Sequence, residues 1–236
     1  MPRRFQLVRR YTIWCPTRLG SVCIALLLSI SVGWWLICGE SFLSATNRLP
    51  VDVLVVEGWI GRPGIHASVE EFEKRGYKYI VATGGLTSGR WEEEPESYAE
   101  MAAAEIIRLG IPREKIIVAP AKYTENHRTF ESAVAVWRAL RAMGIQKKGL
   151  NVFTFGPHAT RSRLVFAKVA GSETDVGVIG WIPPDFAAAP WWQSSERARE
   201  LLEETVGCLY EALLNSGRGS NSPADIADFV QRPNPR

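Results

Sequence analysis

The chain has 236 residues, 46% of them hydrophobic, which is enough to bury one sizeable core. Its formal net charge of +3 is unevenly distributed, because residues 1–39 contain five arginines and no acidic residue. The rest of the chain holds the other 23 basic residues and all 25 acidic ones, a net charge of −2. A domain with this balance has no general attraction for nucleic acid, so we expect no DNA or RNA partner.

A run of twenty uncharged residues, Leu19–Cys38, follows a basic flank at 1–18. A helix that crosses a bilayer needs about 20 apolar residues. The arginines lie on the N-terminal side of the run, which predicts a single-pass anchor with its N-terminus in the cytoplasm and the domain outside. The alternative is a cleaved signal peptide. The run is longer than the about 7–15 apolar residues of a signal peptide, and no small-residue cleavage site follows it cleanly.

After the anchor we expect a short tether at 39–50, a folded domain at 51–214 and a disordered tail at 215–236. The tail is rich in Gly, Ser, Asn and Pro and has little hydrophobic content. The four cysteines follow neither a disulfide framework nor the spacing of metal ligands. They are Cys15, Cys23, Cys38 and Cys208.

Five strand patterns alternate with amphipathic helical patterns along the domain. The first, Val51–Glu57, is a continuous β-branched run, which is typical of a parallel strand buried on both faces. The others are Tyr79–Thr83, Ile116–Ala119, Leu150–Phe155 and Asp175–Ile179, and a long final helix is expected at Ser194–Leu214. This order predicts an α/β fold, a Rossmann-like three-layer sandwich with a mostly parallel five-stranded sheet.

Ligands of open parallel sheets bind beyond the carboxyl ends of the strands, so the residues at the strand exits are the candidate site. These are Glu57 after the first strand, Gly84 and Gly85 after the second, Arg128, Thr129 and Glu131 after the third, and His158 and Arg161 after the fourth. Thr129 is expected to be the N-cap of its helix, and an acid such as Glu131 is favoured in a first turn.

The fourth exit combines a Gly156-Pro157 turn with a helix N-terminus, which favours anion binding. Arg161 lies one turn before Val165, which faces the sheet, so it should project into the cleft and suits phosphate or carboxylate. His158 is the candidate general acid or base, with Glu57 as its partner. The structural alternative is that His158 only caps the helix.

The other signals for cofactors are weak. Gly84 and Gly85 lack the third glycine of a dinucleotide fingerprint, which argues against a nicotinamide cofactor and leaves a simple chain turn as the alternative. One carboxylate and one histidine do not predict a metal site, so no metal is expected.

Several short motifs occur in an order that resembles the bacterial YdcF/SanA/ElyC-like family, an envelope-associated domain of unknown function. They are VDVLVVEGW, ATGG, GIPREKI, RTFESA, GPHATRSRLVF and WWQSSERARELLEETVGCLY, from about Val51 to Leu214. The chain looks most like the membrane-anchored branch, with Glu57-Gly58-Trp59 in place of the family's glycine run. Ser132 stands where Asn is common, and Ser97 stands where the family has an acid.

The resemblance implies a Rossmann-like domain on the plasma (inner) membrane with a role in cell-envelope and cell-wall homeostasis. The implied ligand is a phosphorylated or anionic envelope metabolite, such as a lipid-carrier phosphate. S-adenosylmethionine binding is linked to some relatives. The matched positions are Gly84, Gly85, Thr129, Glu131, His158 and Arg161.

Two other functions fit the same sequence. One is a non-catalytic envelope factor that docks a protein partner through Trp181–Trp192 and the acidic loop at Glu92–Glu94. The other is a cytoplasmic domain that binds S-adenosylmethionine or a nucleotide, on an anchor of reversed orientation. Whether the domain is an enzyme stays open at this point, with a transferase or hydrolase of a phosphorylated metabolite as the catalytic version.

Overall fold

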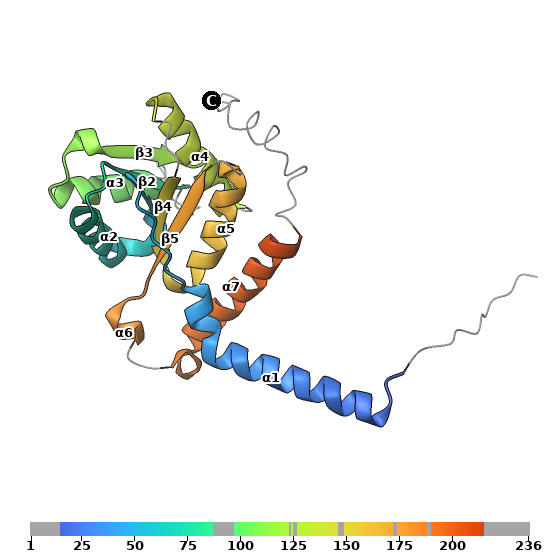
Figure 1. The fold of residues 1–236 in the computed structure, drawn as a ribbon. Helices are drawn as coiled ribbons and strands as arrows, with labels where there is room; N and C mark the ends of the chain where they lie inside the picture. Colours follow the sequence, from blue (N-terminus) through green and yellow to red (C-terminus); the bar gives the residue numbers. More distant parts are fainter. Residues whose placement is uncertain are drawn as a thin grey trace, which may run out of the picture. The chain divides into compact units, whose positions relative to one another are not determined.

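The computed structural model describes residues 15–86, 97–122, 124, 127–145, 149–171, 174–187 and 190–214 (Figure 1). It divides into two units, 1–38 and 39–236. The predictions for most of the basic flank, for the acidic loop at Glu92–Glu94 and for the tail at 215–236 lie outside the described residues.

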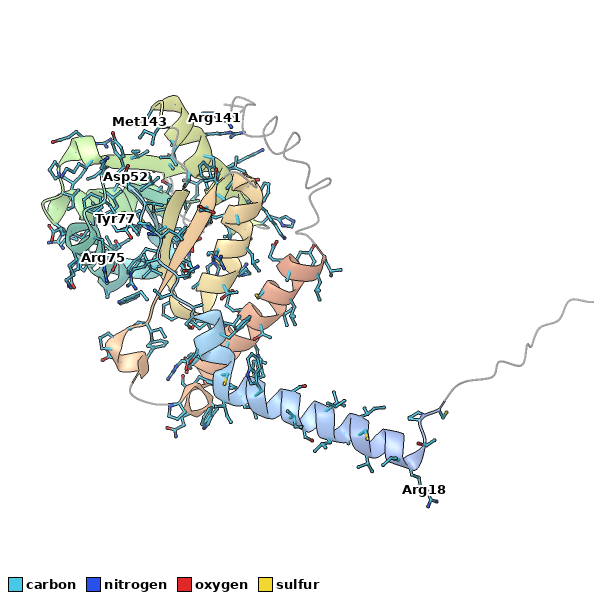
Figure 2. All side chains as sticks on the ribbon, in the orientation of Figure 1. Arg18, Asp52, Arg75, Tyr77, Arg141 and Met143 are labelled. Carbon is cyan, nitrogen blue, oxygen red and sulfur yellow. The ribbon has the colours of Figure 1, made fainter. Side chains whose placement is uncertain are left out.

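The first unit is dominated by helix α1, Arg18–Leu43, which begins in it and ends five residues beyond the predicted span. Within the described part of the chain, this is the one helix long and apolar enough to cross a membrane. Side chains project from α1 on all sides (Figure 2), and leucines such as Leu19 and Leu27 are mostly exposed. A helix that is apolar all round suits a lipid environment.

The second unit is built on a five-stranded sheet in which every strand pair is parallel, as the alternation of strands and helices predicts. The strand order is β3-β2-β1-β4-β5. The bounds are Val53–Glu57 for β1, Tyr79–Gly84 for β2, Ile116–Pro120 for β3, Gly149–Phe155 for β4 and Asp175–Trp181 for β5.

Helices cover both faces of the sheet (Figure 1). Their bounds are α2 Gly61–Arg75, α3 Tyr98–Arg108, α4 Arg128–Ala142, α5 Ala159–Ala170, α6 Pro184–Ala187 and α7 Ser195–Leu213. Short 3₁₀ turns are η1 Gly58–Ile60, η2 Arg113–Lys115, η3 Gly156–His158 and η4 Trp191–Gln193.

Alternation along the strands separates the core into two layers. In β1, Val53 and Val55 pack with residues of α4 and α5, whereas Leu54 and Val56 pack with residues of α2 and α3. Successive side chains of a strand point to opposite faces, so a continuous apolar run is what a strand covered on both sides requires. Helix α7 lies against α5 on the outside of one layer.

The segment expected to be a simple tether packs on the domain. The backbone of Asn47 exchanges hydrogen bonds of 2.8 and 2.9 Å with Val178, which adds an antiparallel bridge to β5. Arg48 pairs with Glu71 of α2 at 2.7 Å. An edge strand such as β5 has unpaired backbone groups on one side, which explains why the incoming chain is held there.

Asn151 of β4 ties this segment to the sheet. It is fully buried; its Oδ1 accepts from the Leu49 N–H at 3.0 Å, and its Nδ2 donates to the Leu49 carbonyl and the Tyr77 hydroxyl at 2.9 Å each. Removing a buried polar side chain with all these hydrogen bonds destabilises the fold, because its partners are left without hydrogen bonds.

We predict that Asn151→Ala lowers the free energy of unfolding by about 2 kcal/mol, because the buried Tyr77 hydroxyl and two partly buried backbone groups of Leu49 lose their partner. Urea unfolding of the full chain in detergent, followed by tryptophan fluorescence, measures this. Asn47→Ala is the matched control, since that side chain is exposed and its bridge uses only backbone atoms. Equal losses in the two variants would contradict the prediction.

Candidate functional site

A cleft of about 1250 Å³ lies at the carboxyl ends of the strands. Seven of the eight residues predicted from the strand exits line it, and helix α7 forms another wall. The seven are Glu57, Gly84, Gly85, Arg128, Thr129, His158 and Arg161. The eighth, Glu131, is buried and does not line the cleft. It lies two residues beyond Thr129, about 200° away around the helix.

Glu57 ends β1 with the parity of Val53 and Val55, so its side chain faces α4 and α5. It is almost fully buried, and its Oε2 accepts hydrogen bonds from the hydroxyls of Thr154 and Ser162, the latter at 2.9 Å. The same oxygen lies 3.7 Å from Nε2 of His158. Glu57 is therefore beside the histidine, as predicted, but at a distance longer than a hydrogen bond.

The carboxylate that bonds His158 is Glu204 of α7. Nδ1 of His158 lies 2.9 Å from Glu204 Oε1. Arg161, one turn further along α5, donates to both oxygens of Glu204 at 2.7 Å. Burial alone raises the pKa of Glu204, but the hydrogen bonds and charges of His158 and Arg161 outweigh it and lower that pKa to about 2.

The short contacts determine where the imidazole proton lies. Nδ1 of His158 and Oε1 of Glu204 are 2.9 Å apart, so one of them must carry a proton. Because the pKa of Glu204 is about 2, the carboxyl is ionised at neutral pH and we assign the proton to Nδ1. The Nη2 group of Arg161, 2.9 Å from Nδ1, then donates to Glu204 instead. In the tautomer that carries its single proton on Nδ1, the lone pair of Nε2 lies on the other side of the ring.

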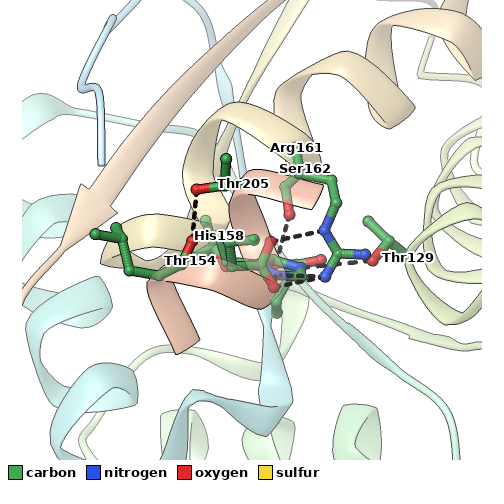
Figure 3. A network of polar contacts seen from close by, with 9 residues as sticks. Thr129, Thr154, His158, Arg161, Ser162 and Thr205 are labelled. Atoms are coloured by element: carbon green, nitrogen blue, oxygen red, sulfur yellow. Dashed lines mark hydrogen bonds and ion pairs between the residues drawn. The ribbon is translucent and has the colours of Figure 1, made fainter. Parts of the chain in front are cut away.

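Nε2 of His158 meets the hydroxyl of Thr129 at 3.4 Å (Figure 3). The prediction that Thr129 caps α4 was wrong. The helix begins at Arg128, and His127 occupies the N-cap position with a φ of 58°. Thr129 therefore lies inside the first turn, where its hydroxyl is directed at the histidine. Trp59 packs edge-on to the His158 ring, with centroids 4.9 Å apart.

Arg161 lies in the cleft as predicted, but its guanidinium group forms an ion pair with Glu204. Its side chain is 27% exposed. The chain of α7 approaches it closely at Gly207, where an added Cβ would come within 2.9 Å of Arg161 Cδ. The exposed cations of the lining are Lys122 and Arg128.

The sequence reasoning missed α7 as a wall of the site. Four of its acids line the cleft: Glu200, Glu203, Glu204 and Glu211. The spacing in the sequence could have indicated this wall. Glu204 and Glu211 each follow an apolar residue, Leu201 and Cys208, by three positions, which places them on the buried side of the helix. Burial and the neighbouring Glu204 raise the pKa of Glu200, so the two carboxyls differ in proton affinity.

The described residues offer neither a metal site nor a good fit to S-adenosylmethionine. No group of three or more His, Cys, Asp or Glu among them is placed to hold a metal ion. The turn after β1 is covered by α3, since Gly58 lies against the Tyr98 backbone. Between 79 and 86, the exit of β2 has no acid to bind a ribose hydroxyl. Ser97 caps α3 through a capping box with Glu100.

No protein-family model matches the sequence, and a comparison with curated proteins found no similar chain.

We predict that the fold loses stability in acid because the carboxylate of Glu204 becomes protonated. The pKa of this carboxyl is lower in the folded chain, about 2, than its ordinary 4.5. Its ionised form therefore stabilises the fold above about pH 5, and this contribution disappears as the pH falls toward 2. The difference in unfolding free energy between wild type and Glu204→Gln should therefore change by about 3 kcal/mol across that range, with wild type losing stability as the pH falls.

Urea unfolding at a series of pH values measures this divergence. The matched control is Glu203→Gln, an exposed carboxyl on the same helix, because a solvent-exposed ion pair such as that of Glu203 with Arg199 contributes little to stability. A divergence of the same size in both variants would show that Glu204 is not specially paired.

Proposed function

We propose that this protein is a YdcF-like, membrane-anchored extracytoplasmic domain that binds or processes a phosphorylated or anionic metabolite of the cell envelope. The observation that carries the proposal is His158, whose Nδ1 is bonded to Glu204 while Nε2 faces a large cleft at the strand ends. An oriented imidazole in a cleft is suited to general acid–base chemistry. The ordered motifs of the sequence support the family, and the arginines before α1 support the topology.

The cleft has chemistry for two parts of such a ligand. Lys122 and Arg128 are exposed cations beside the first turn of α4, whose N–H groups and dipole also attract an anion. On the α7 side, Glu200 and Glu203 present carboxylates that accept hydrogen bonds from hydroxyl groups. A phosphorylated sugar carries both an anion and several hydroxyls, so it fits this distribution of charge.

The roles of the three central residues follow from their contacts. His158 transfers a proton at Nε2, and Glu204 orients the ring and balances the charge that forms on it. Arg161 holds Glu204 in place through two hydrogen bonds. Glu57, whose Oε2 accepts from two hydroxyls, is better suited to stabilising a cationic His158 than to exchanging a proton with substrate.

The topology is tested with a reporter fused after Arg236. Because all the flanking arginines precede the apolar run, we predict that alkaline phosphatase at this position is active and that a green fluorescent protein fusion is dark. Replacing Arg3, Arg4, Arg9 and Arg10 by Glu should weaken this orientation. A fluorescent, phosphatase-inactive fusion of the native sequence would place the domain in the cytoplasm and remove the envelope substrates.

Ligand binding is tested by thermal shift on the full chain in detergent, with a panel of inorganic phosphate, sugar phosphates and polyprenyl phosphate. A ligand at 100 times its dissociation constant should stabilise the fold by about 2.7 kcal/mol. Arg128→Ala should weaken binding about tenfold, because a charge-assisted hydrogen bond is lost. The control is Arg62→Ala, an exposed arginine in the first turn of α2 that does not line the cleft. If no anion shifts the melting temperature, the proposal fails.

A second candidate function is a non-catalytic envelope interaction factor. It is favoured by an exposed apolar surface, because Trp192 is 56% exposed and α7 exposes a row of apolar side chains. The row comprises Leu202, Val206, Leu209 and Leu213. If His158→Ala folds and fully restores function to cells that lack the protein, this second function replaces the first.

A further inference from the structure

The side chains around His158 form a chain of three groups from three different helical elements. Thr129 lies on α4, His158 ends η3, and Glu204 lies on α7. The Thr129 hydroxyl is 3.4 Å from Nε2, and Glu204 is 2.9 Å from Nδ1. A hydroxyl, an imidazole and a carboxylate in this order have the arrangement of a nucleophile, its general base and the group that orients the base.

We propose that Thr129, His158 and Glu204 form a catalytic triad that cleaves or transfers a carboxylic ester through an acyl group on Thr129. This goes beyond the proposed binding of an anionic metabolite and does not depend on it. The separation between Thr129 and His158 is longer than an ideal hydrogen bond. Such contacts are often loose before substrate binds and tighten in the reacting complex.

The assigned proton position suits this step. With Nδ1–H donated to Glu204, the lone pair of Nε2 is the acceptor for the Thr129 hydroxyl proton. In the first half-reaction, Thr129 Oγ1 bonds to the ester carbon and its proton moves to Nε2. The bond from that carbon to the leaving oxygen then breaks, and the leaving oxygen takes the proton from Nε2.

In the second half-reaction, water attacks the acyl carbon and gives a proton to Nε2. The bond to Thr129 Oγ1 breaks, and Oγ1 recovers the proton. The products are a carboxylic acid and an alcohol, with no change in oxidation state. An acceptor alcohol in place of water gives transfer instead of hydrolysis.

The surroundings stabilise the charges that this chemistry forms. The imidazolium that arises on His158 lies between Glu204 and Glu57, whose Oε2 is 3.7 Å from Nε2. Thr129 is in the first turn of α4, where the positive end of the helix dipole favours a developing oxyanion. The adjacent Arg128 adds a positive charge on the same turn.

The carboxylates also decide between an acyl and a phosphoryl reaction at Thr129. Glu57, Glu200 and Glu204 all line the cleft, and among these three Arg161 forms hydrogen bonds with Glu204 alone. These carboxylates disfavour a phosphoryl group with two negative charges more than a carboxylic ester, which is neutral. Any anionic part of the substrate belongs nearer to Lys122 and Arg128.

The test uses the full chain in detergent and two probes that need no knowledge of the natural substrate. One is a fluorophosphonate, which labels activated hydroxyls irreversibly, and the other is p-nitrophenyl acetate, whose hydrolysis is followed by absorbance. We expect the fluorophosphonate adduct at Thr129, located by peptide mass spectrometry. Thr129→Val and His158→Gln should each lower labelling and hydrolysis by on the order of 100-fold.

Two further variants separate catalysis from folding. Thr129→Ser keeps a hydroxyl, so the adduct should appear on the introduced side chain. Thr205→Val should behave as wild type, because the Thr205 hydroxyl donates to the Leu201 carbonyl within α7 and does not line the cleft. Glu204→Gln should lower the labelling rate while leaving Thr129 as the labelled position.

The proposal is overturned if the folded wild-type chain forms no adduct and hydrolyses no ester, or if the adduct forms equally in Thr129→Val. Thermal shifts with phosphates are independent of these readouts. Labelling of Thr129 without an anion-induced thermal shift would support the triad and reject anion binding. An anion-induced shift without labelling would support anion binding and reject the triad.

Discussion

The bond network around the Glu204 carboxylate is the interaction on which the rest of the site depends. A buried carboxylate is costly unless it is paired, and Glu204 satisfies this requirement through Arg161 on one side and His158 on the other. The three groups hold one another in position. The ionised carboxylate accepts a hydrogen bond from Nδ1–H of His158, so Nε2 is the ring nitrogen with a lone pair toward the cleft. The same pairing attaches α7 to α5, so the closing helix is part of the site as well as of the fold.

The sheet supplies the second constraint. Parallel strands end at one edge, and alternation puts Glu57 and Thr154 on the face covered by α4 and α5. Neighbouring strands place these two side chains beside each other, one register step beyond the pair Val56 and Phe153. The buried oxygen of Glu57 is thereby held within 3.7 Å of His158 by hydroxyls from β4 and α5.

The charge of the cleft is mixed, and this shapes its chemistry. Cations are found on the loop after β3 and the start of α4, whereas carboxylates are concentrated on α7. Such a cleft is poorly matched to a compact polyanion and better matched to a molecule with an anionic end and a neutral polar end. The proposed metabolite binding uses the cations Lys122 and Arg128. The proposed ester chemistry takes place at Thr129, at the start of α4, where its hydroxyl contacts His158.

Much of the architecture could be predicted from the sequence. The apolar run at Leu19–Cys38, the five strand patterns and the final helix follow from local hydrophobicity and periodicity, which require only neighbouring residues. The exit residues Glu57, Thr129, His158 and Arg161 could also be placed on one rim, because all parallel strands end there.

The pairing of these residues was decided only by the tertiary structure. Glu204 lies 46 positions after His158, and nothing local shows that α7 packs its acidic side against α5. The role of Thr129 differs from the prediction for a similar reason. The helix begins two residues earlier than expected, with His127 in a left-handed conformation at the N-cap, so the Thr129 hydroxyl faces His158 instead of capping the helix. Periodicity determines which elements form, but the contacts between distant side chains depend on how those elements pack, and that packing determines the chemistry.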